Sequence, residues 1–563
     1  MTSELLGVVF TYLLTLLIAI PLGTYVAKVY LGEKTWLDFM APLEKAFFRI
    51  SGIDAEKQLT WKQNLFALLT INVIWFLLAT IILLTQGSLP LNPDGNPSMT
   101  PDLAFNTAIS FIVNCNLQDY SGETGVTYLS QLAVMMFLHF MSAATGMAAL
   151  AMVFKAFQSK TTQTLGNFFN YFLITCTRIL LPFSFVIAIL LAFNGTPASF
   201  KGKDTFVSVQ GDTVHVSRGP AAGMIAIKHL GTNGGGWFGA NSAHPLENPN
   251  YFTNTLELVS QVIIPIAMIF AFGYFIKRKK LSWSIFGVMT AGLILLVLPA
   301  IYYEMSGNPE ITKMGIDQSL GSMEGKEVRF GSVSSAYWAV VTTIISTGSV
   351  NAMHDSLTPM TGLITMLGMM VNAFYGGCGV GMLNYFIFFV VTVFIAGLMV
   401  GRTPELLGHK LEAREVKIAI MMALLHPFII LIPTAMAAFG ITQHPDYGWL
   451  NNPGAHGFSE MLYQYTSCAA NNGSGFEGLG DNTPWWNISA GFVMILGRYL
   501  PIVGPVAIAG LLASKKYVPE SAGTLKVDSF TFGATTFAVI VIIAALSFFP
   551  TLVLGPLAEF FSM

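Results

Sequence analysis

The sequence has 563 residues, of which 53% are hydrophobic and 10% charged, and its formal net charge is −2. Soluble domains carry about 25% charged residues, so most of this surface must face lipid, and the near-neutral charge offers no basic surface for nucleic acid. The sequence contains no CxxC pair, no P-loop and no GxGxxG signature with an acidic partner. We therefore expect a polytopic membrane protein whose energy comes from an ion gradient or from another subunit.

Ten apolar segments are long enough to cross the hydrocarbon core, which requires about 20 helical residues. Lysine and arginine gather in alternate connections, whereas the other connections are richer in glycine, proline and asparagine. Basic connections favour the cytoplasmic side, so the alternation predicts ten crossings with both termini outside the cell. The predicted spans are residues 5–27, 64–84, 128–154, 166–193, 255–275, 282–303, 361–400, 418–440, 485–513 and 530–555.

The seventh apolar segment, residues 361–400, is roughly twice as long as one crossing requires. Its middle carries the string GGCGVG, with Gly376, Gly377, Gly379 and Gly381. Irregular backbone at membrane depth is tolerated only inside protein or beside a watery cavity. Two interpretations stay open here: a flexible turn between two short helices, or an intramembrane loop that obstructs a pathway.

Four of the outside connections share one plan. Each has an apolar segment of about 10–12 residues, too short to span and typical of a re-entrant helix, then a small polar cluster and a polar stretch. Four such units suggest internal repeats around an axis. The polar turns are Asn114–Gln118, Thr232–Gly236, Ser346–Ser349 and Asn471–Ser474.

The chemistry of these turns suits a cation. Short helices entering from outside would place their partly negative C-terminal ends near mid-membrane. Glycine and asparagine accept φ > 0, so the turns can aim backbone carbonyls at an ion and replace the hydration shell of potassium. No Asp or Glu lies within the turns, whereas calcium and magnesium sites use carboxylates. The pattern predicts a filter for a monovalent cation and leaves potassium and sodium open; ordinary glycine- and asparagine-rich surface loops are the alternative.

Several charged residues lie in or near the spans, where charges usually face the bundle interior. Glu257 begins a span just after an outside loop, which predicts an interfacial position. Arg498 lies in mid-span, and we expect an interior structural ion pair there. Lys228 and His229 precede the second turn, where packing and helix capping are the expected roles. Asp355 follows the third turn and is expected to make a stabilising hydrogen bond.

Four strings resemble the KdpA family, the potassium-binding subunits of bacterial Kdp potassium-transporting P-type ATPases: LGTNGGGWFGANSAHPLENPN, STGSVNAMHDS, LMVGRTPE and AANNGSGFEG. That family belongs to the Trk/Ktr/HKT superfamily of potassium transporters. The resemblance runs from end to end and implies an all-α polytopic fold with four membrane–pore–membrane repeats around a pseudo-fourfold filter. The implied divisions are residues 1–63 for the first span and its connection, 64–154, 155–276, 277–401 and 402–514 for the four repeats, with a broken helix at 376–381 in the third, and 515–563 for the last span.

The resemblance also implies roles for residues of the four turns. Gln118 lies where the family has a residue that influences affinity, and the GGCGVG loop would hinder direct leakage of the ion to the cytoplasm. The first turn departs from the others, because it has asparagine where they have glycine. The implied potassium filter consists of Asn114, Cys115, Asn116, Gln118, Thr232, Asn233, Gly234, Ser346, Thr347, Gly348, Asn471, Asn472 and Gly473.

Partners follow from the same resemblance. The family works with a catalytic P-type ATPase subunit (KdpB), whose DKTGT motif is absent here, a single-span accessory subunit (KdpC) and often a very short hydrophobic peptide (KdpF). The implied function is the ion-selecting, non-catalytic subunit of an ATP-driven potassium importer in the bacterial plasma membrane, with no organic cofactor. A stand-alone Trk/Ktr-type channel or cation symporter predicts the same filter and stays open.

Overall fold

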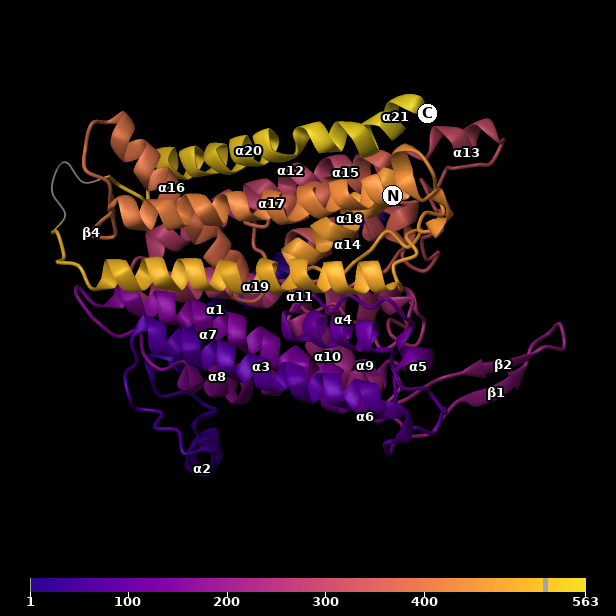
Figure 1. Cartoon of the computed structure of the whole chain (residues 1–563), viewed down its shortest axis with the longest axis horizontal. Coiled ribbons are helices and arrows are strands. Elements are labelled where there is room, and N and C mark those ends of the chain that lie inside the picture. Colours follow the sequence, from indigo (N-terminus) through magenta and orange to yellow (C-terminus); the bar gives the residue numbers. More distant parts are fainter. Residues whose placement is uncertain (1, 520–524) are drawn as a thin grey trace.

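A computed structural model describes residues 2–519 and 525–563 of the chain. Within these ranges, ten helices are long and apolar enough to cross a membrane, which confirms the predicted ten-span fold. They lie side by side in one bundle (Figure 1). The spanning helices are α1 (Thr2–Leu31), α3 (Trp61–Thr85), α7 (Phe137–Gln158), α9 (Leu181–Phe193), α11 (Tyr251–Phe275), α12 (Lys279–Ser306), α16 (Val380–Met399), α17 (Ala413–Gln443), α19 (Pro484–Ala513) and α20 (Phe530–Leu552).

Three of the spans are extended by further helical segments. Shorter stretches, several of them π-helical, precede α7 and α9 and follow α20. These segments are α6 (Tyr128–Ser130), η3 (Gln131–Met136), α8 (Phe168–Thr175), η4 (Cys176–Leu180), η8 (Val553–Leu557) and α21 (Ala558–Ser562).

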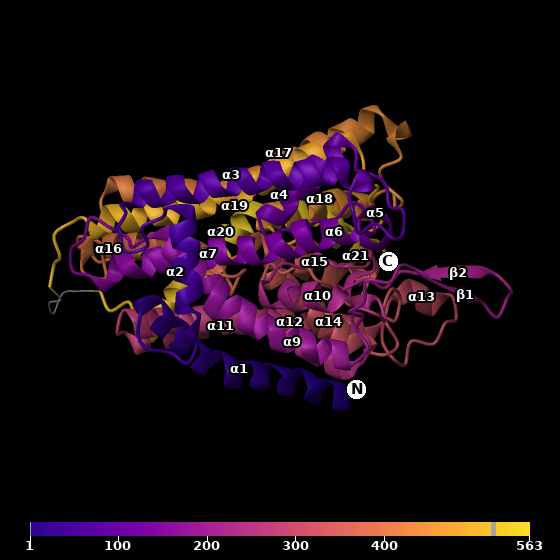
Figure 2. The same cartoon turned by 90° about the horizontal axis from the view of Figure 1, so that it is seen from below.

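Burial separates inner spans from outer ones. Helix α11 is the most enclosed of the described spans: 94% of the residues in its most apolar stretch are buried in the protein, against 22% for α1. Helix α1 can approach α11 closely because it carries Gly23, where a Cβ would lie 2.5 Å from the carbonyl oxygen of Ala267. Small residues at such crossings are how membrane helices gain packing contacts without a hydrophobic driving force. Figure 2 shows α1 along the margin of the bundle.

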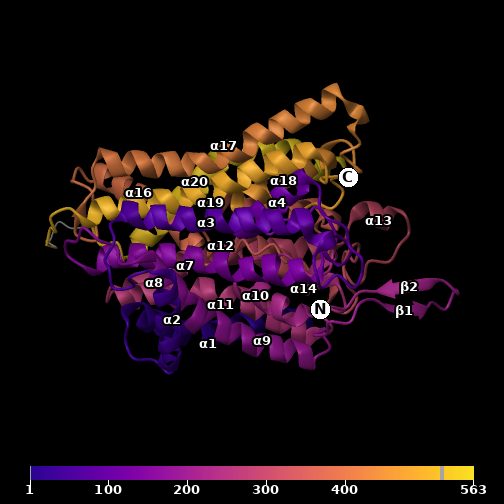
Figure 3. The ribbon, with the colours of Figure 1, turned by 60° about the horizontal axis from the view of Figure 1, so that its bottom comes forward.

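Four short helices occupy the interior of the half that also holds both chain ends (Figure 3). Nearly all of their side chains are buried, although they are only 10 to 16 residues long. Each is followed by one of the polar turns identified in the sequence. The four are α4 (Pro101–Ile112), α10 (Ala221–Leu230), α14 (Gly331–Ile344) and α18 (Ala455–Ala470).

The long apolar segment 361–400 is divided in two. Helix α15 (Pro359–Val371) ends at Asn372, which has a left-handed φ of 42°, and α16 begins at Val380. The irregular residues 372–379 between them are buried. Backbone of this kind lies inside the protein, where other groups can satisfy its hydrogen bonds.

Short elements lie in the connections between these helices, among them two hairpins that were not predicted from the sequence. The first hairpin pairs Asp204 with Val216 and projects from the end that holds the chain termini (Figure 1). The strands are β1 (Asp204–Val207), β2 (Thr213–Val216), β3 (Glu405–Leu406) and β4 (His409–Lys410). The short helices are η1 (Asp38–Met40), α2 (Ala41–Ser51), η2 (Gln86–Ser88), α5 (Gly122–Gly125), η5 (Asn241–Ala243), α13 (Pro309–Lys313), η6 (His354–Ser356) and η7 (Pro445–Tyr447).

Candidate ion-binding site

All four short interior helices end in the same way. The residue after the last turn is left-handed, with φ of 65° at Asn114, 49° at Thr232, 58° at Ser346 and 52° at Asn471. The next N–H then donates to the carbonyl five residues earlier, which is the long bond of a Schellman ending. These bonds are Cys115 to Ser110 (3.0 Å), Asn233 to Lys228 (2.8 Å), Thr347 to Thr342 (2.9 Å) and Asn472 to Ser467 (2.9 Å).

A second left-handed residue follows two positions later in every turn. The φ values are 61° at Asn116, 95° at Gly234, 84° at Gly348 and 97° at Gly473, and the residue between each pair has an ordinary φ. Alternation of hand places successive N–H groups on one side of the backbone and therefore leaves successive carbonyls on the other. The four turns thus share one backbone conformation, although their sequences differ.

Close backbone approaches join the turns in a ring. A Cβ on Gly234 would lie 2.0 Å from the carbonyl oxygen of Thr347, in the third turn. A Cβ on Gly348 would lie 1.9 Å from that of Asn472, in the fourth. A Cβ on Gly473 would lie 2.0 Å from that of Cys115, in the first. Glycine therefore permits a spacing that no other residue could adopt without displacing a carbonyl.

Asn116 occupies the position that glycine holds in the other turns. Asn116 is 2% exposed and packs against the second turn: a Cβ placed on Gly235 would lie 2.8 Å from the Cβ of Asn116. Among the described residues, neither its amide nitrogen nor its amide oxygen has a hydrogen-bond partner. Asparagine tolerates left-handed backbone better than other residues with a side chain, so the irregular first turn keeps the common conformation.

Side chains reinforce the contacts between turns. The Asn114 amide donates to the carbonyl of Thr232 at 2.7 Å, and the Ser346 hydroxyl donates to that of Ala470 at 2.7 Å. Gln118 makes two bonds to one residue of the second turn: its amide donates to the carbonyl of Gly236 at 3.2 Å and accepts from its N–H at 2.8 Å. Gln118 is therefore placed to fix the first turn relative to the second.

A buried ion pair lies behind the second turn. Lys228 and Glu247 are both fully buried and are bonded to each other. The Lys228 ammonium also donates to Asn241 Oδ1 at 2.6 Å, and Asn241 donates through Nδ2 to the carbonyl of Gly234 at 2.7 Å. Packing and capping were the expected roles of Lys228. The structure adds an ion pair with Glu247 and, through Asn241, a link to the backbone carbonyl of Gly234 in the second turn. Nothing in the sequence near Lys228 indicates a partner 19 residues away.

The predicted interfacial position of Glu257 is wrong. Its side chain is fully buried, with Oε2 2.9 Å from His229 Nε2 and accepting from the Ser242 hydroxyl at 2.8 Å. The outside connection folds back into the bundle and covers the first turns of α11, so a residue near a span end lies deep in the protein.

The glycine-rich loop between α15 and α16 contacts the second turn. The N–H of Cys378 donates to the Thr232 hydroxyl at 2.9 Å. A Cβ on Gly379 would lie 2.2 Å from the carbonyl oxygen of Gly146 on α7, and one on Gly376 would lie 2.1 Å from Cα of Gly381. Both glycines are left-handed, so the loop is packed closely against the bundle core on one side and the turn on the other.

Arg498 lies beside the same loop. It is 3% exposed and donates through Nη2 to the carbonyl of Ser142 at 2.7 Å. The space next to Gly146 is bounded by Arg498 Nη2 and the carbonyl oxygen of Cys378, which lie 3.1 and 2.3 Å from a Cβ placed there. No ion pair joins Arg498 to a carboxylate in the described part of the chain, so the predicted interior ion pair is wrong. A backbone carbonyl takes the place of the carboxylate.

Comparison with known proteins decides the family. A profile of the family described as "KdpA: Potassium-transporting ATPase A subunit" matches residues 9–561. The chain belongs to the KdpA family. Proteins named "Potassium-transporting ATPase potassium-binding subunit" are 64% identical in Flavobacterium johnsoniae, over all of both chains, and 46% identical in Geobacillus kaustophilus, over 98% of each.

A solved structure shares the fold. The potassium transporter TrkH from Vibrio parahaemolyticus superposes with a TM-score of 0.50 at 14% identity, covering 89% of this chain and 97% of that one. The family and the fold expected from the sequence are therefore both confirmed. Because TrkH is only 14% identical to this chain, the comparison with it shows a shared fold and nothing more.

Proposed function

We propose that this KdpA-family chain is the ion-selecting subunit of an ATP-driven potassium importer in the bacterial plasma membrane. The observation that carries the proposal is the ring of four turns, each with the same two left-handed residues and the same helix ending. The ring offers backbone carbonyls without a carboxylate, which suits a monovalent ion that exchanges its hydration shell for carbonyl oxygens. Relatives covering the whole chain are named potassium-binding subunits of a potassium-transporting ATPase.

The proposed filter consists of the residues predicted from the sequence in the four turns, together with Gln118. Asn114, Cys115 and Asn116, the first three residues of the first turn, are at most 2% exposed, so an ion there would be held by protein and not by bulk water. The short helices point their C-terminal ends at the turns, and the partial negative charge of those ends favours a cation.

The glycine-rich loop and Arg498 are proposed to block a direct route to the cytoplasm. The loop lies against the second turn through Cys378 and Thr232, and a buried guanidinium beside it repels a second cation. An ion that leaves the filter would then need a lateral route toward a catalytic partner, for which we propose KdpB, with KdpC and KdpF as accessory subunits. Both termini, at the end that holds the short helices (Figure 1), are proposed to lie outside the cell.

Rubidium uptake tests the proposal against a stand-alone channel or symporter. Cells without other potassium importers would express this chain with or without the catalytic ATPase subunit, and uptake would be measured before and after ATP depletion. We expect uptake only with both subunits and with ATP. Uptake by this chain alone that survives ATP depletion would contradict the pump-subunit proposal and favour the alternative.

A further inference from the structure

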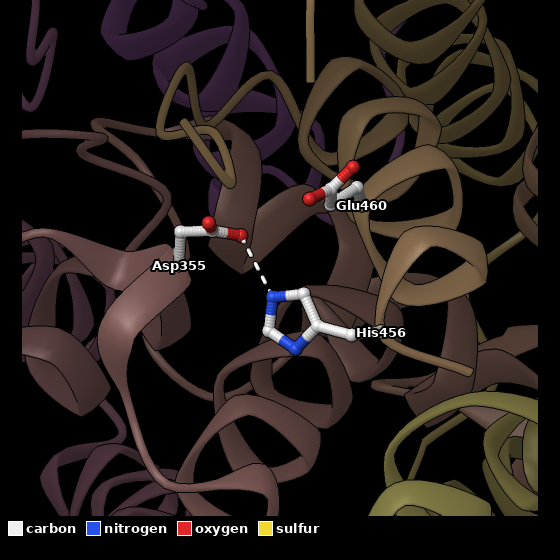
Figure 4. Close-up of side chains that lie close together, drawn as sticks. All are labelled: Asp355, His456 and Glu460. Atoms are coloured by element: carbon white, nitrogen blue, oxygen red, sulfur yellow. Dashed lines mark hydrogen bonds and ion pairs between the residues drawn. The ribbon is translucent and has the colours of Figure 1, made fainter. Parts of the chain in front are cut away.

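Three side chains that could ligate a metal meet at the end of the molecule that holds the chain termini. Asp355 lies in η6, just after the third turn, and His456 and Glu460 lie four residues apart at the start of α18. One ligand atom from each lies within 4.8 Å of the other two. Figure 4 shows the three side chains directed at one another.

The imidazole of His456 is held in place by a carboxylate on the nitrogen that faces away from Asp355. Its Nδ1 is 2.9 Å from Glu559 Oε1, on the C-terminal helix α21, and its Nε2 is 3.0 Å from Asp355 Oδ1. A proton on Nδ1, shared with Glu559, leaves the lone pair of Nε2 facing a carboxylate; either a second proton on Nε2 or a metal cation bound there relieves that repulsion. A carboxylate that accepts from the second ring nitrogen is also the usual support of a metal-bound histidine.

Glu460 supplies an independent observation. The residue is fully buried, and its Oε1 accepts from the Asn452 amide at 2.9 Å. Its Oε2 is buried and has no hydrogen-bond partner among the described residues. A buried carboxylate oxygen without a partner is costly, and in Figure 4 one oxygen of this carboxylate points toward Asp355 and His456.

A glycine leaves room where the carboxylates converge. A Cβ on Gly478 would lie 2.2 Å from Glu460 Oε1 and 2.8 Å from Asp355 Oδ2. The Asn452 amide nitrogen lies 2.8 Å from the same point and donates to both carboxylates, to Glu460 Oε1 at 2.9 Å and to Asp355 Oδ2 at 3.3 Å. The Asp355 and His456 side chains are 8% and 20% exposed, so an ion can reach the cluster from the solvent.

We propose that Asp355, His456 and Glu460 bind a divalent cation of the zinc class, with Glu559 as a positioning residue for His456. One imidazole nitrogen with two carboxylates matches the donors that zinc accepts, with a water in the fourth position. Calcium and magnesium prefer sites made of oxygen alone. Three carboxylates against one imidazole also leave a negative charge that a divalent ion neutralises.

The site would join three parts of the chain that are distant in sequence. Asp355 follows the third turn, His456 and Glu460 begin the helix that ends at the fourth turn, and Glu559 belongs to the last helix. A bound ion would therefore hold the outer segments of the third and fourth repeats together. This inference is independent of which ion the four-turn ring selects.

Zinc binding to the purified, metal-stripped transporter complex tests the site. Calorimetric titration with Zn²⁺ would be compared between the wild type and the variants Asp355→Asn, Glu460→Gln and Gly478→Ala, with Mg²⁺ as the comparison ion. The matched control is His215→Ala, which removes the exposed histidine of the β1–β2 hairpin. Co²⁺ would then be substituted and its visible absorption recorded, because the spectrum reports a four-coordinate site with a nitrogen ligand.

We expect one Zn²⁺ site that Asp355→Asn, Glu460→Gln and Gly478→Ala abolish or weaken at least about 100-fold, whereas His215→Ala leaves it unchanged. Glu559→Gln should weaken binding about 10–100-fold, as loss of a supporting carboxylate does. The proposal is overturned if the wild type binds Zn²⁺ no more tightly than Mg²⁺. It is equally overturned if folded Asp355→Asn and Glu460→Gln variants keep wild-type zinc affinity, because His456 would then be only an imidazolium bridging two carboxylates.

Discussion

At the residue scale, the ring depends on backbone conformations that few residues can adopt. Two positions in each turn are left-handed, and glycine fills the second of them in three turns out of four. Glycine there serves two purposes, since it accepts the dihedral angle without steric cost and lets a neighbouring carbonyl approach within 2.0 Å of where a Cβ would be. Asn116 meets only the first requirement, which explains why the first turn can differ.

Replacing Gly348 with alanine tests the ring directly. The new Cβ would lie 1.9 Å from the carbonyl oxygen of Asn472, at a φ of 84°, so the third and fourth turns must separate. We expect Gly348→Ala to lower potassium affinity at least about tenfold, or about 1.4 kcal/mol, and to weaken selection against sodium. Rubidium displacement by potassium and sodium would measure both. The matched control is Gly287→Ala on α12, where no atom lies within 4 Å of the added Cβ; equal effects of the two substitutions would contradict the assignment.

Two carboxyl groups outside the spans predict a pH dependence of stability. Asp119 follows the first turn and is 6% exposed, and its burial, with the charge of Asp481, raises its pKa well above 3.8. Burial raises the pKa of Asp481 to about 6, although its hydrogen bond to Asp119 acts in the opposite direction. Between the unfolded pKa near 3.8 and the folded value, the folded state binds more protons than the unfolded state, so stability falls as the pH rises.

Thermal unfolding of the detergent-solubilised complex between pH 4 and pH 7 would measure this slope. We expect the unfolding temperature of the wild type to fall as the pH rises from about 4 through about 6. Asp119→Asn should flatten the slope, because it removes a carboxyl group whose raised pKa makes the folded state bind an extra proton in this range. A wild-type and an Asp119→Asn curve of the same shape would show that this pair does not titrate in that range.

At the element scale, the spans and the short helices were predictable, whereas the contacts behind them were not. Runs of apolar residues and the alternation of basic loops mark the ten spans, and the four turns stand out because glycine and asparagine recur at the same place in each repeat. The Lys228–Glu247 pair left no such pattern, since its partners lie on either side of a turn and meet only in the fold. His456 and Glu460, four residues apart on one helix face, are the only part of the proposed metal site that is visible as a local pattern, because Asp355 and Glu559 are distant in sequence.

The Lys228–Glu247 pair should be essential for the second turn. Lys228→Met leaves Glu247 buried without its partner, and breaking a buried pair costs roughly 3–5 kcal/mol. It also removes a donor to Asn241, which holds the carbonyl of Gly234. We expect a lower unfolding temperature and weaker potassium binding in the purified complex. The double variant Lys228→Met/Glu247→Leu should recover stability, because it leaves no unpaired charge; a double variant less stable than Lys228→Met would contradict this explanation.

At the scale of the whole molecule, the buried loop of residues 372–379 lies beside the ring of turns. Residues 372–379 lie between α15 and α16, and they are held by the second turn through Thr232 and by α7 through Gly146. A packed loop beside the ring is what we expect of a subunit that passes its ion to a partner.

We propose that Arg498 helps to close the route past this loop, so its removal should open a leak. Its guanidinium donates to the carbonyl of Ser142 and bounds the space beside Gly146 that Cys378 also borders. A fixed positive charge in a low-dielectric interior repels a cation far more strongly than it would in water, so we expect Arg498 to oppose the passage of an ion from the ring. Arg498→Met removes the charge and keeps most of the apolar stem. We expect passive rubidium flux into proteoliposomes that contain the variant complex without ATP, and none with the wild type. Arg498→Lys retains the charge and should stay tight; a leak through Arg498→Lys equal to that of Arg498→Met would assign the closure to the packing of the loop and not to the charge.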